Sequence, residues 1–284
     1  MRATAAGIVL AGGRSTRMGR PKAALEWHGS TLLQRVVGIV GRVVDGPVVV
    51  VRAPGQQLPA LPPGAAIATD AREGRGPLQG LAAGLEAVGD GAERAYVSST
   101  DVPLLHPAFV RRVLRVAELE GADVALPVAH GFRHPLAAAY RTALLPTVER
   151  LIAEDRMKPA FLFEEAQVHE LDEDELLRDR ELAEADPKLL SLSNLNDPDD
   201  YDRARSRSAP AVTVRCFGAL ARNGGGHEPV PVHAATLAAA AAATGVALDR
   251  HVVAALNGDQ ISRNPEYPLA AGDAVAFLAA DAGG

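Results

Sequence analysis

Residues 6–22 read AGIVLAGGRSTRMGRPK, an apolar run that passes directly into a loop of glycines and basic residues. Continuous runs of Val, Ile and Leu are typical of parallel strands that are buried on both faces. Gly12, Gly13 and Gly19 let backbone N–H groups approach a ligand closely. Because ligands of parallel α/β sheets bind at the carboxyl ends of the strands, this stretch predicts an α/β fold with a binding loop after its first strand.

Further apolar runs alternate with helical patterns through the first two-thirds of the chain. The expected strands cover residues 6–11, 47–52, 96–100 and 123–128. Apolar residues at three- and four-residue spacing predict helices over residues 30–43, 77–88 and 106–120. This alternation indicates a three-layer α/β domain with a mostly parallel sheet.

The pattern changes after about residue 205. The stretch SRSAPA, residues 206–211, is small and polar and predicts a linker. Residues 212–284 then combine short strands with an alanine-rich helix that ends at Gly245, which indicates a small α+β module. We therefore expect one domain over residues 1–205 and a second over residues 212–284.

Composition limits the classes of protein that remain. The chain has 284 residues, of which 48% are hydrophobic, and a net charge of −6 without a basic stripe, so we expect no nucleic-acid partner. Its one cysteine, Cys216, cannot form an internal disulfide, which fits a reducing compartment. No run approaches the ~18 apolar residues that span a bilayer, and the N-terminus lacks a signal-peptide cleavage pattern. We expect a cytoplasmic protein without a membrane partner.

Basic residues surround the glycines of the first loop, namely Arg14, Arg17, Arg20 and Lys22. Backbone N–H groups and positive charge together suit the phosphates of a nucleoside triphosphate, although a glycine-rich turn with solvated arginines is the alternative. The loop is neither a Walker A motif nor a GxGxxG motif. Lys22 is the only lysine among the first 150 residues, and its compact charge on a long stem can reach between phosphate oxygens.

Four more stretches follow this loop along the chain: DAREGRGPLQGLAAGL at 70–85, STDVPLL at 99–105, RHPLAAAY at 133–140 and NLNDPDDY at 194–201. With the glycine loop, they make residues 5–205 resemble the molybdenum cofactor guanylyltransferase family, MobA. The resemblance implies a Rossmann-like nucleotidyltransferase fold of the GT-A type. It also implies transfer of GMP from GTP to the phosphate of molybdenum-bound molybdopterin, which yields the guanine dinucleotide cofactor and pyrophosphate.

The resemblance implies catalytic roles for Arg17, Lys22 and Asp101. Asp101 follows an expected strand end, where a carboxylate can hold Mg²⁺ against phosphate oxygens, unless it only forms an Asp-Val-Pro turn. Arg17 and Lys22 would balance charge on the triphosphate and the departing pyrophosphate. The nucleophile is a phosphate that is already ionised, so no general base is required.

Binding residues are implied in the same way. The nucleotide-binding set comprises Leu10, Ala11, Gly12, Gly13, Lys22, Asp70, Gly76, Pro77, Leu78, Gly80 and Asp101. The acceptor-binding set comprises His134, Asn194 and Asn196, and Asx turns before the last helix are the alternative for the two asparagines. Two departures concern nucleotide specificity: Arg52 lies in a region where the family often has asparagine, and Gln79 stands where it usually has alanine.

The C-terminal module resembles MoaD, the small β-grasp sulfur carrier of molybdopterin synthase. The stretches VRCFGALAR (214–222), VAALNGDQIS (253–262) and LAAGDAVAFLAADAGG (269–284) carry this resemblance. It implies that Gly283 and Gly284 form a delivery arm whose terminal carboxylate is adenylated and converted to a thiocarboxylate. It further implies partnership with the large subunit of molybdopterin synthase and an adenylating enzyme, and with molybdoenzymes or their chaperones.

Alternative functions remain open on the sequence. The LAGG and GPLQG segments favour GTP, because related cytidylyltransferases carry LAAG and lack a GPLxG segment, but a CTP-dependent enzyme or another phosphate acceptor is the nearest alternative. A different class would be an assembly protein that binds nucleotide without turnover and uses an inert β-grasp binding module.

Overall fold

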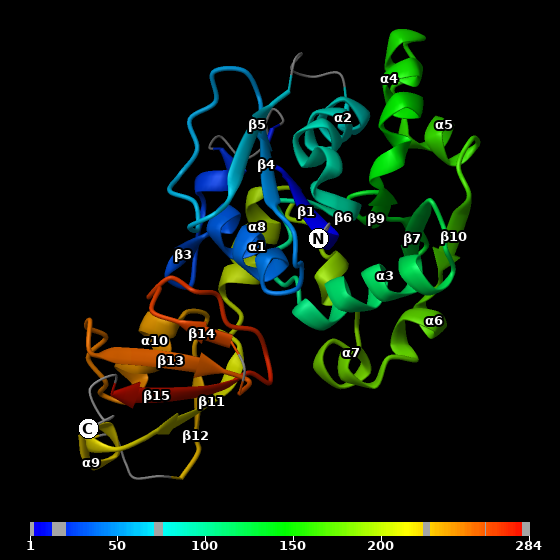
Figure 1. Cartoon of the computed structure of the whole chain (residues 1–284). Helices are drawn as coiled ribbons and strands as arrows, with labels where there is room; N and C mark the ends of the chain where they lie inside the picture. The colour runs from blue at the N-terminus through cyan, green and yellow to red at the C-terminus, as the bar shows by residue number, and fades with distance from the viewer. Residues whose placement is uncertain (1–2, 13–20, 71–75, 224–227, 259, 280–284) are drawn as a thin grey trace. The chain divides into compact units, whose positions relative to one another are not determined.

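The computed structural model describes residues 3–12, 21–70, 76–223, 228–258 and 260–279 (Figure 1). The chain divides into two compact units. The first comprises Met1–Leu25 and Leu32–Asp200, and the second comprises Glu26–Thr31 and Tyr201–Gly284. The division falls inside helix α8 (Pro198–Arg205), and the irregular segment 206–210 separates this helix from the next strand.

The first unit contains an eight-stranded sheet with the order β10-β7-β9-β6-β1-β4-β5, in which β8 pairs with β7. Its strands are β1 (Ala3–Leu10), β4 (Val48–Arg52), β5 (Ala66–Thr69), β6 (Ala92–Ser99), β7 (Val124–Ala129), β8 (Phe132–Arg133), β9 (Ala137–Arg141) and β10 (Val168–Leu171). The pairs β1–β4, β1–β6, β4–β5 and β7–β10 are parallel. The predicted mostly parallel sheet is therefore confirmed.

Strand β9 is an antiparallel exception that the sequence pattern did not reveal. It pairs antiparallel with both β6 and β7. Its sequence, AAAYR, is dominated by alanine, the strongest helix former, so local propensity does not predict a strand. Pairing overrides that preference, because β6 pairs with all five residues of β9 and β7 pairs with Ala139 and Tyr140 from the other side.

Two glycines show that helices cover both faces of this sheet. A side chain at Gly7 in β1 would collide with Val40 of helix α1 (Leu32–Gly41). A side chain at Gly84 of helix α2 (Pro77–Val88) would collide with Ile8, the next residue of β1. Since successive side chains of a strand point to opposite faces, α1 and α2 lie on opposite sides of the sheet. The predicted three layers are confirmed.

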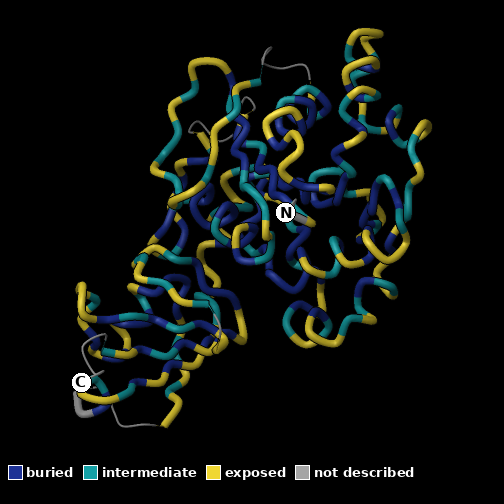
Figure 2. The backbone as a smooth tube through the Cα atoms, viewed as in Figure 1, coloured by how far each residue is buried: buried dark blue, intermediate teal, exposed yellow. Residues whose placement is uncertain are grey.

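The central strands are the most deeply buried part of the first unit (Figure 2). Three predicted helices are confirmed as α1, α2 and α3 (Pro107–Leu119). The remaining helices are α4 (Leu145–Ala153), α5 (Pro159–Phe163), α6 (Glu173–Leu177), α7 (Arg180–Ala185) and the short 3₁₀ helices η1 (Lys22–Ala24), η2 (Gly89–Gly91), η3 (Thr142–Leu144) and η4 (Leu190–Leu192). Helices α2 and α4 pack on one apolar core with β1, β6 and β9.

The second unit contains a five-stranded sheet with the order β12-β11-β15-β13-β14. Its elements are β11 (Ala211–Cys216), α9 (Ala219–Asn223), β12 (Val230–His233), α10 (Leu237–Ala243), β13 (Val252–Leu256), β14 (Gln260–Ser262) and β15 (Ala274–Ala279), together with the hairpin β2 (Glu26–Trp27) and β3 (Ser30–Thr31). The first and last strands, β11 and β15, pair in parallel at the centre, and the other pairs are antiparallel.

Helix α10 packs on this second sheet. Leu237 and Ala241 share an apolar core with Val214 and Phe277. Thr236 caps the helix by accepting a hydrogen bond from the Ala239 backbone N–H at 3.2 Å. Cys216 is buried in the same core, as the sequence predicts for a small core residue. None of the helices in the part of the chain that the structure describes combines the length and the apolar character needed to cross a membrane.

Candidate active site

The strand order places one edge of the first sheet where ligands of α/β folds bind. The chain runs from β1 outward to β4 and β5, and then returns to β6 on the other side of β1. The order therefore reverses between β1 and β6, and ligands occupy the crevice outside the carboxyl ends of strands at such a point. β1 ends at Leu10 and β6 ends at Ser99, so the glycine loop and Asp101 both follow this point, as predicted.

Lys22 and Asp101 meet at this edge, although 78 residues lie between them in the chain. The Lys22 Nζ donates to Asp101 Oδ2 at 2.7 Å and to the Leu195 carbonyl oxygen at 2.5 Å. Ser99 Oγ donates to Asp101 Oδ1 at 2.6 Å, and the Leu195 backbone N–H donates to the Asp101 carbonyl at 2.9 Å. Three separate segments thus converge, after β1, after β6 and before α8.

The pair is shielded but still accessible, with side-chain exposures of 21% for Lys22 and 15% for Asp101. Partly buried opposite charges attract more strongly than they do at the surface, which fixes both groups in place. Ser99 and Leu195 were not predicted. Ser99 lies two residues before Asp101, a local signal that could have identified it, whereas Leu195 acts through its backbone and leaves no signal in its residue type.

The residues at this edge could supply only some of the ligands that Mg²⁺ needs. Within the described ranges, no group of three or more His, Cys, Asp or Glu side chains could hold a metal ion. Mg²⁺ in nucleotide-dependent enzymes uses one or two carboxylates and takes its other ligands from phosphates and water. Asp101 matches that requirement as a single carboxylate, so the site suits a metal that arrives with a nucleotide.

A glutamine holds the beginning of the glycine loop against the end of β4. Ala11 and Gly12 donate their backbone N–H groups to the Val51 carbonyl at 2.8 and 3.2 Å. Gln56 Nε2 donates to the Ala11 carbonyl at 2.9 Å, and its Oε1 accepts from the Ala53 backbone N–H at 2.9 Å. Gln56 could not be predicted from the sequence, because its role depends on two backbone groups that only folding brings within reach.

Asp70 continues the same edge. It directly follows β5, and its backbone N–H donates to the Arg52 carbonyl at 2.8 Å. The Arg52 side chain donates through Nε to Thr69 Oγ1 at 3.3 Å and through Nη1 to the Gln56 carbonyl at 3.3 Å. Arg52, which departs from the family pattern, therefore connects the β4 and β5 ends of this edge.

The start of α2 places the GPLQG segment. Gly76 precedes the helix with a φ of 99°, a conformation that favours glycine, and Pro77 occupies the first turn. Leu78 is fully buried, and Gly80 allows Leu10 to pack closely, since a Cβ there would lie 3.2 Å from Leu10 Cδ2. Leu78 and Gly80 are both buried and thus support the segment by packing.

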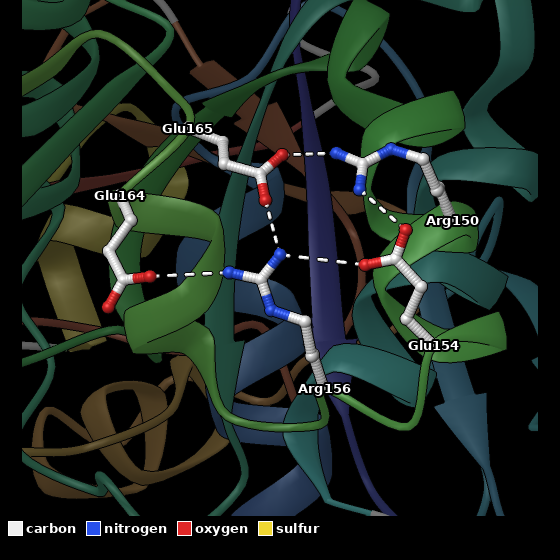
Figure 3. Close-up of polar contacts among 5 residues, drawn as sticks. All are labelled: Arg150, Glu154, Arg156, Glu164 and Glu165. Atoms are coloured by element: carbon white, nitrogen blue, oxygen red, sulfur yellow. Dashed lines mark hydrogen bonds and ion pairs between the residues drawn. The ribbon is translucent and has the colours of Figure 1, made fainter.

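Five charged side chains form a network of ion pairs between the end of α4, the loop that contains Met157, and the end of α5 (Figure 3). They are Arg150, Glu154, Arg156, Glu164 and Glu165. Arg156 bonds to Glu165 at 2.6 Å and Glu164 at 3.2 Å and lies 3.5 Å from Glu154, while Arg150 pairs with Glu154 and Glu165. The carbonyl oxygen of the next residue, Met157, lies 3.5 Å from the position that a Cβ of Gly76 would take. The network therefore fixes a loop beside the first turn of α2.

The predicted acceptor residues lie in two places. His134 donates its backbone N–H to the Pro127 carbonyl at 2.9 Å, and its Nε2 lies 3.1 Å from the Ala129 carbonyl. Burial lowers the pKa of His134, so its ring is neutral near pH 7. Asn194 and Asn196 are exposed on either side of Leu195, next to the Lys22–Asp101 pair.

Several predicted residues lie outside the described residues: Gly13, Arg14, Arg17, Gly19, Arg20, Gly283 and Gly284. Their roles, and those of the other predicted site residues, stay predictions.

The fold and this edge define a nucleotidyltransferase-like α/β unit, and comparison with known proteins specifies its family. The MobA-like NTP transferase domain matches residues 7–169, more than half of the chain, so the chain belongs to the MobA-like NTP transferase family. The predicted MobA membership is confirmed, and with it the enzyme class. The match ends before residues 201–284, which form most of the second unit, and does not address the MoaD resemblance.

Relatives agree with this membership. The chain is 44% identical over 151 residues to a "Probable molybdenum cofactor guanylyltransferase" of Mycobacterium avium (strain 104), covering 52% of this chain and 75% of the relative. A protein of the same name from Mycobacterium tuberculosis (strain ATCC 25618 / H37Rv) is 41% identical over 160 residues, or 55% of this chain and 78% of that protein.

A solved structure supports the fold alone. The crystal structure of molybdopterin-guanine dinucleotide biosynthesis protein A from Archaeoglobus fulgidus has a TM-score of 0.56 and 24% identity, and covers 70% of this chain and 96% of that one. The predicted mixed α/β nucleotidyltransferase fold is thereby confirmed.

Proposed function

We propose that this protein transfers GMP from GTP to the phosphate of molybdenum-bound molybdopterin and releases pyrophosphate. The observation that carries the proposal is the Lys22–Asp101 pair at the point where the strand order reverses. Membership of the MobA-like NTP transferase family and the 44% identity to a relative named as a guanylyltransferase support the choice of nucleotide and acceptor.

The proposed mechanism is positioning combined with charge stabilisation. Asp101 would hold Mg²⁺, which would neutralise charge on the phosphates. Ser99 orients the carboxylate by its hydrogen bond to Oδ1. The Lys22 ammonium, on its flexible stem, turns from Asp101 toward phosphate oxygens, and Arg17 adds positive charge to the same loop. The acceptor phosphate is ionised near pH 7, so no side chain has to remove a proton.

We propose that the nucleotide contacts the backbone around Ala11 and Gly12, next to the end of β4, together with Asp70 after β5 and Gly76 before α2. The acceptor side is proposed from His134, Asn194 and Asn196. A neutral His134 donates its one N–H from Nε2 to the Ala129 carbonyl, so its Nδ1 can accept one hydrogen bond from the pterin without adding charge, and the exposed asparagines flank the carbonyl that holds Lys22.

The test is turnover of GTP and CTP in parallel, with molybdenum-bound molybdopterin as acceptor and with Mg²⁺ either present or removed by a chelator. The dinucleotide product is identified by mass spectrometry. We expect product with GTP only, and only with Mg²⁺. Product with CTP alone would support a cytidylyltransferase, and GTP binding without product would support an assembly protein.

We also propose a second function, carried by the sheet of the C-terminal unit. Its five strands with the packed helix α10 are consistent with a β-grasp domain over residues 212–284, and the expected linker 206–211 ends one residue earlier, since Ala211 already belongs to β11. β15 lies inside the sheet, paired with β11 and β13, so residues 280–284 follow directly from a fixed strand. We propose that Gly283 and Gly284 carry sulfur for molybdopterin synthesis, with the synthase large subunit and an adenylating enzyme as partners.

The test of this second function is chemical. The full chain is incubated with an adenylating enzyme of the ubiquitin-activating type, ATP and a sulfur donor, and its intact mass is measured. We expect the mass to rise by the difference between one sulfur and one oxygen atom. Deletion of Gly283 and Gly284, or addition of one residue after them, abolishes that rise and leaves GTP turnover unchanged. If the deletion slows GTP turnover and no thiocarboxylate forms, the carrier function is wrong.

A further inference from the structure

A cavity of about 400 Å³ opens at the opposite edge of the first sheet, at the amino-terminal ends of β1 and β6. Thr4 of β1 and Arg94 of β6 line it from the strands, and Arg111, Arg115 and Glu118 line it from helix α3. Because β1 and β6 are parallel, this cavity and the Lys22–Asp101 pair lie at opposite ends of the same two strands. The proposed guanylyl transfer does not use it.

Arg94 is the unusual group in this cavity. Its residue is only 9% exposed, and within the described residues its guanidinium has no hydrogen-bond or ion-pair partner. Arg35, which is similarly buried, differs because its Nε donates to the Pro103 carbonyl at 2.5 Å. Burial lowers the pKa of Arg94, and the like charge of Arg141 on β9 adds to that effect. Glu93, Glu118 and Asp123 attract this guanidinium through space, but none of them supplies the paired oxygens of a hydrogen-bonded carboxylate, so among the described residues the guanidinium keeps its capacity to bind an anion.

The other charged groups of the cavity fall into two classes. Some already have partners: Asp45 accepts from the Thr4 and Ala5 backbone N–H groups at 3.0 and 2.9 Å, and Arg111 pairs with Glu181. Asp179 caps α7 by accepting from the Leu182 backbone N–H at 3.0 Å.

Four groups remain uncommitted within the described residues: Arg94, Arg115, Glu93 and Glu118. Glu93 and Glu118 attract Arg94 through space without a hydrogen bond. The cavity is therefore lined by two cations, Arg94 and Arg115, and by two anions, Glu93 and Glu118. A polyanion such as a nucleoside triphosphate would be repelled by the carboxylates, whereas a molecule with one anionic and one cationic group matches both signs.

We propose that this cavity binds a small zwitterion of the α-amino-acid class, with its carboxylate on Arg94 and its ammonium toward Glu93 and Glu118. The planar fork of a guanidinium matches a carboxylate with two parallel hydrogen bonds. The volume lies within the range of small-molecule sites. The site is separate from the nucleotide edge, and it stands whether or not the proposed transferase activity does.

The experiment uses the full chain and the twenty common amino acids, each at about 1 mM, the weak limit of specific binding, first by thermal shift and then by titration calorimetry. Each amino acid that binds is compared with its carboxamide, which lacks the carboxylate, and with its N-acetyl form, which lacks the ammonium. The variants are Arg94→Met and Arg94→Lys, with Arg207→Met at an exposed position as the control.

We expect at least one amino acid to bind, and its affinity to fall about tenfold to a hundredfold in Arg94→Met, in line with loss of a charged hydrogen-bonded pair. Arg94→Lys retains part of the affinity, Arg207→Met retains all of it, and both blocked ligands bind at least about tenfold more weakly. Absence of binding by every amino acid overturns the proposal. So does binding that survives Arg94→Met or that the carboxamide reproduces. If Arg94→Met does not fold, the affinity of Arg94→Lys and the binding of the carboxamide and N-acetyl ligands test the proposal in its place.

Discussion

A largely buried charge lies near each end of strand β6, Asp101 after the carboxyl end and Arg94 near the amino end, and the two charges differ in their hydrogen bonds. Beyond the carboxyl end, Asp101 receives hydrogen bonds from Lys22 at 2.7 Å and Ser99 at 2.6 Å. Near the amino end, Arg94 is more deeply buried, and within the described residues it has no hydrogen-bond or ion-pair partner. Asp101 is held by direct hydrogen bonds from the chain, whereas Arg94 is attracted by Glu93, Glu118 and Asp123 only through space.

This difference separates two kinds of functional site. Where the chain supplies the partner, the groups are held in place before a ligand arrives, which suits chemistry that relies on positioning. Where the partner is missing, the protein loses stability until a ligand provides it, which suits binding. Burial of a charge is common to both ends, so burial alone does not identify the role.

The largest effect is expected at the carboxyl end, from Asp101→Asn. The amide keeps the shape but loses the charge that would hold Mg²⁺ and pair with Lys22. The activation free energy therefore rises by about 3–4 kcal/mol, and GTP turnover falls roughly a hundredfold to a thousandfold. Steady-state kinetics measure the loss, circular dichroism checks the fold, and Asp90→Asn, at an exposed position, is the control. Near-normal turnover in a folded variant would remove Asp101 from the mechanism.

The next effect concerns Lys22→Arg, which tests whether the partner must be a compact ammonium. A planar guanidinium cannot take the place of Nζ at 2.7 Å from Asp101 and 2.5 Å from the Leu195 carbonyl without displacing one of them. We expect a loss of about 1.5–3 kcal/mol in kcat/KM, roughly tenfold to a hundredfold. Lys158→Arg, on the exposed surface, is the matched control. Wild-type kinetics in Lys22→Arg would show that only charge matters here.

A smaller effect is expected from Ser99→Ala, which removes one hydrogen bond and leaves both charges in place. The loss of about 1 kcal/mol, roughly fivefold in turnover, comes with a higher Mg²⁺ concentration for half-maximal rate, because Asp101 is less well oriented. Ser206→Ala removes a hydroxyl that donates to the Arg203 carbonyl at 2.9 Å and serves as the control. An unchanged Mg²⁺ requirement in Ser99→Ala would contradict an orienting role.

The smallest effect is expected at the amino end, and it has the opposite sign. Arg94→Met replaces a buried cation that nearby carboxylates attract only through space by an apolar chain of similar length, so the free energy of unfolding stays the same or rises by up to about 1 kcal/mol. Denaturant unfolding without added ligand measures it, with the exposed Arg115→Met for comparison. A fall of more than about 1.5 kcal/mol would mean that Arg94 is stabilised by the chain after all.

The sequence located the carboxyl-end site because its residues lie in local motifs. Lys22 ends the glycine loop and Asp101 follows a strand, so both positions could be placed on one edge of a parallel sheet. Gln56 and Leu195 could not be found in this way. Gln56 hydrogen-bonds to the backbone of both Ala11 and Ala53, and the Leu195 carbonyl accepts a hydrogen bond from Lys22. Neither role can be predicted from the type of residue.

The sequence by itself determined the alternation of strands and helices and the place of Lys22 and Asp101 on one edge of the sheet, because apolar periodicity and short motifs are local properties. Only the tertiary structure decided that β9 is an antiparallel strand, that Leu195 completes the Lys22–Asp101 pair, and that Arg94 is buried without a hydrogen-bond partner among the described residues. These depend on groups that are distant in the chain, and an arginine in a strand has the same letter whether a carboxylate faces it or an open cavity does.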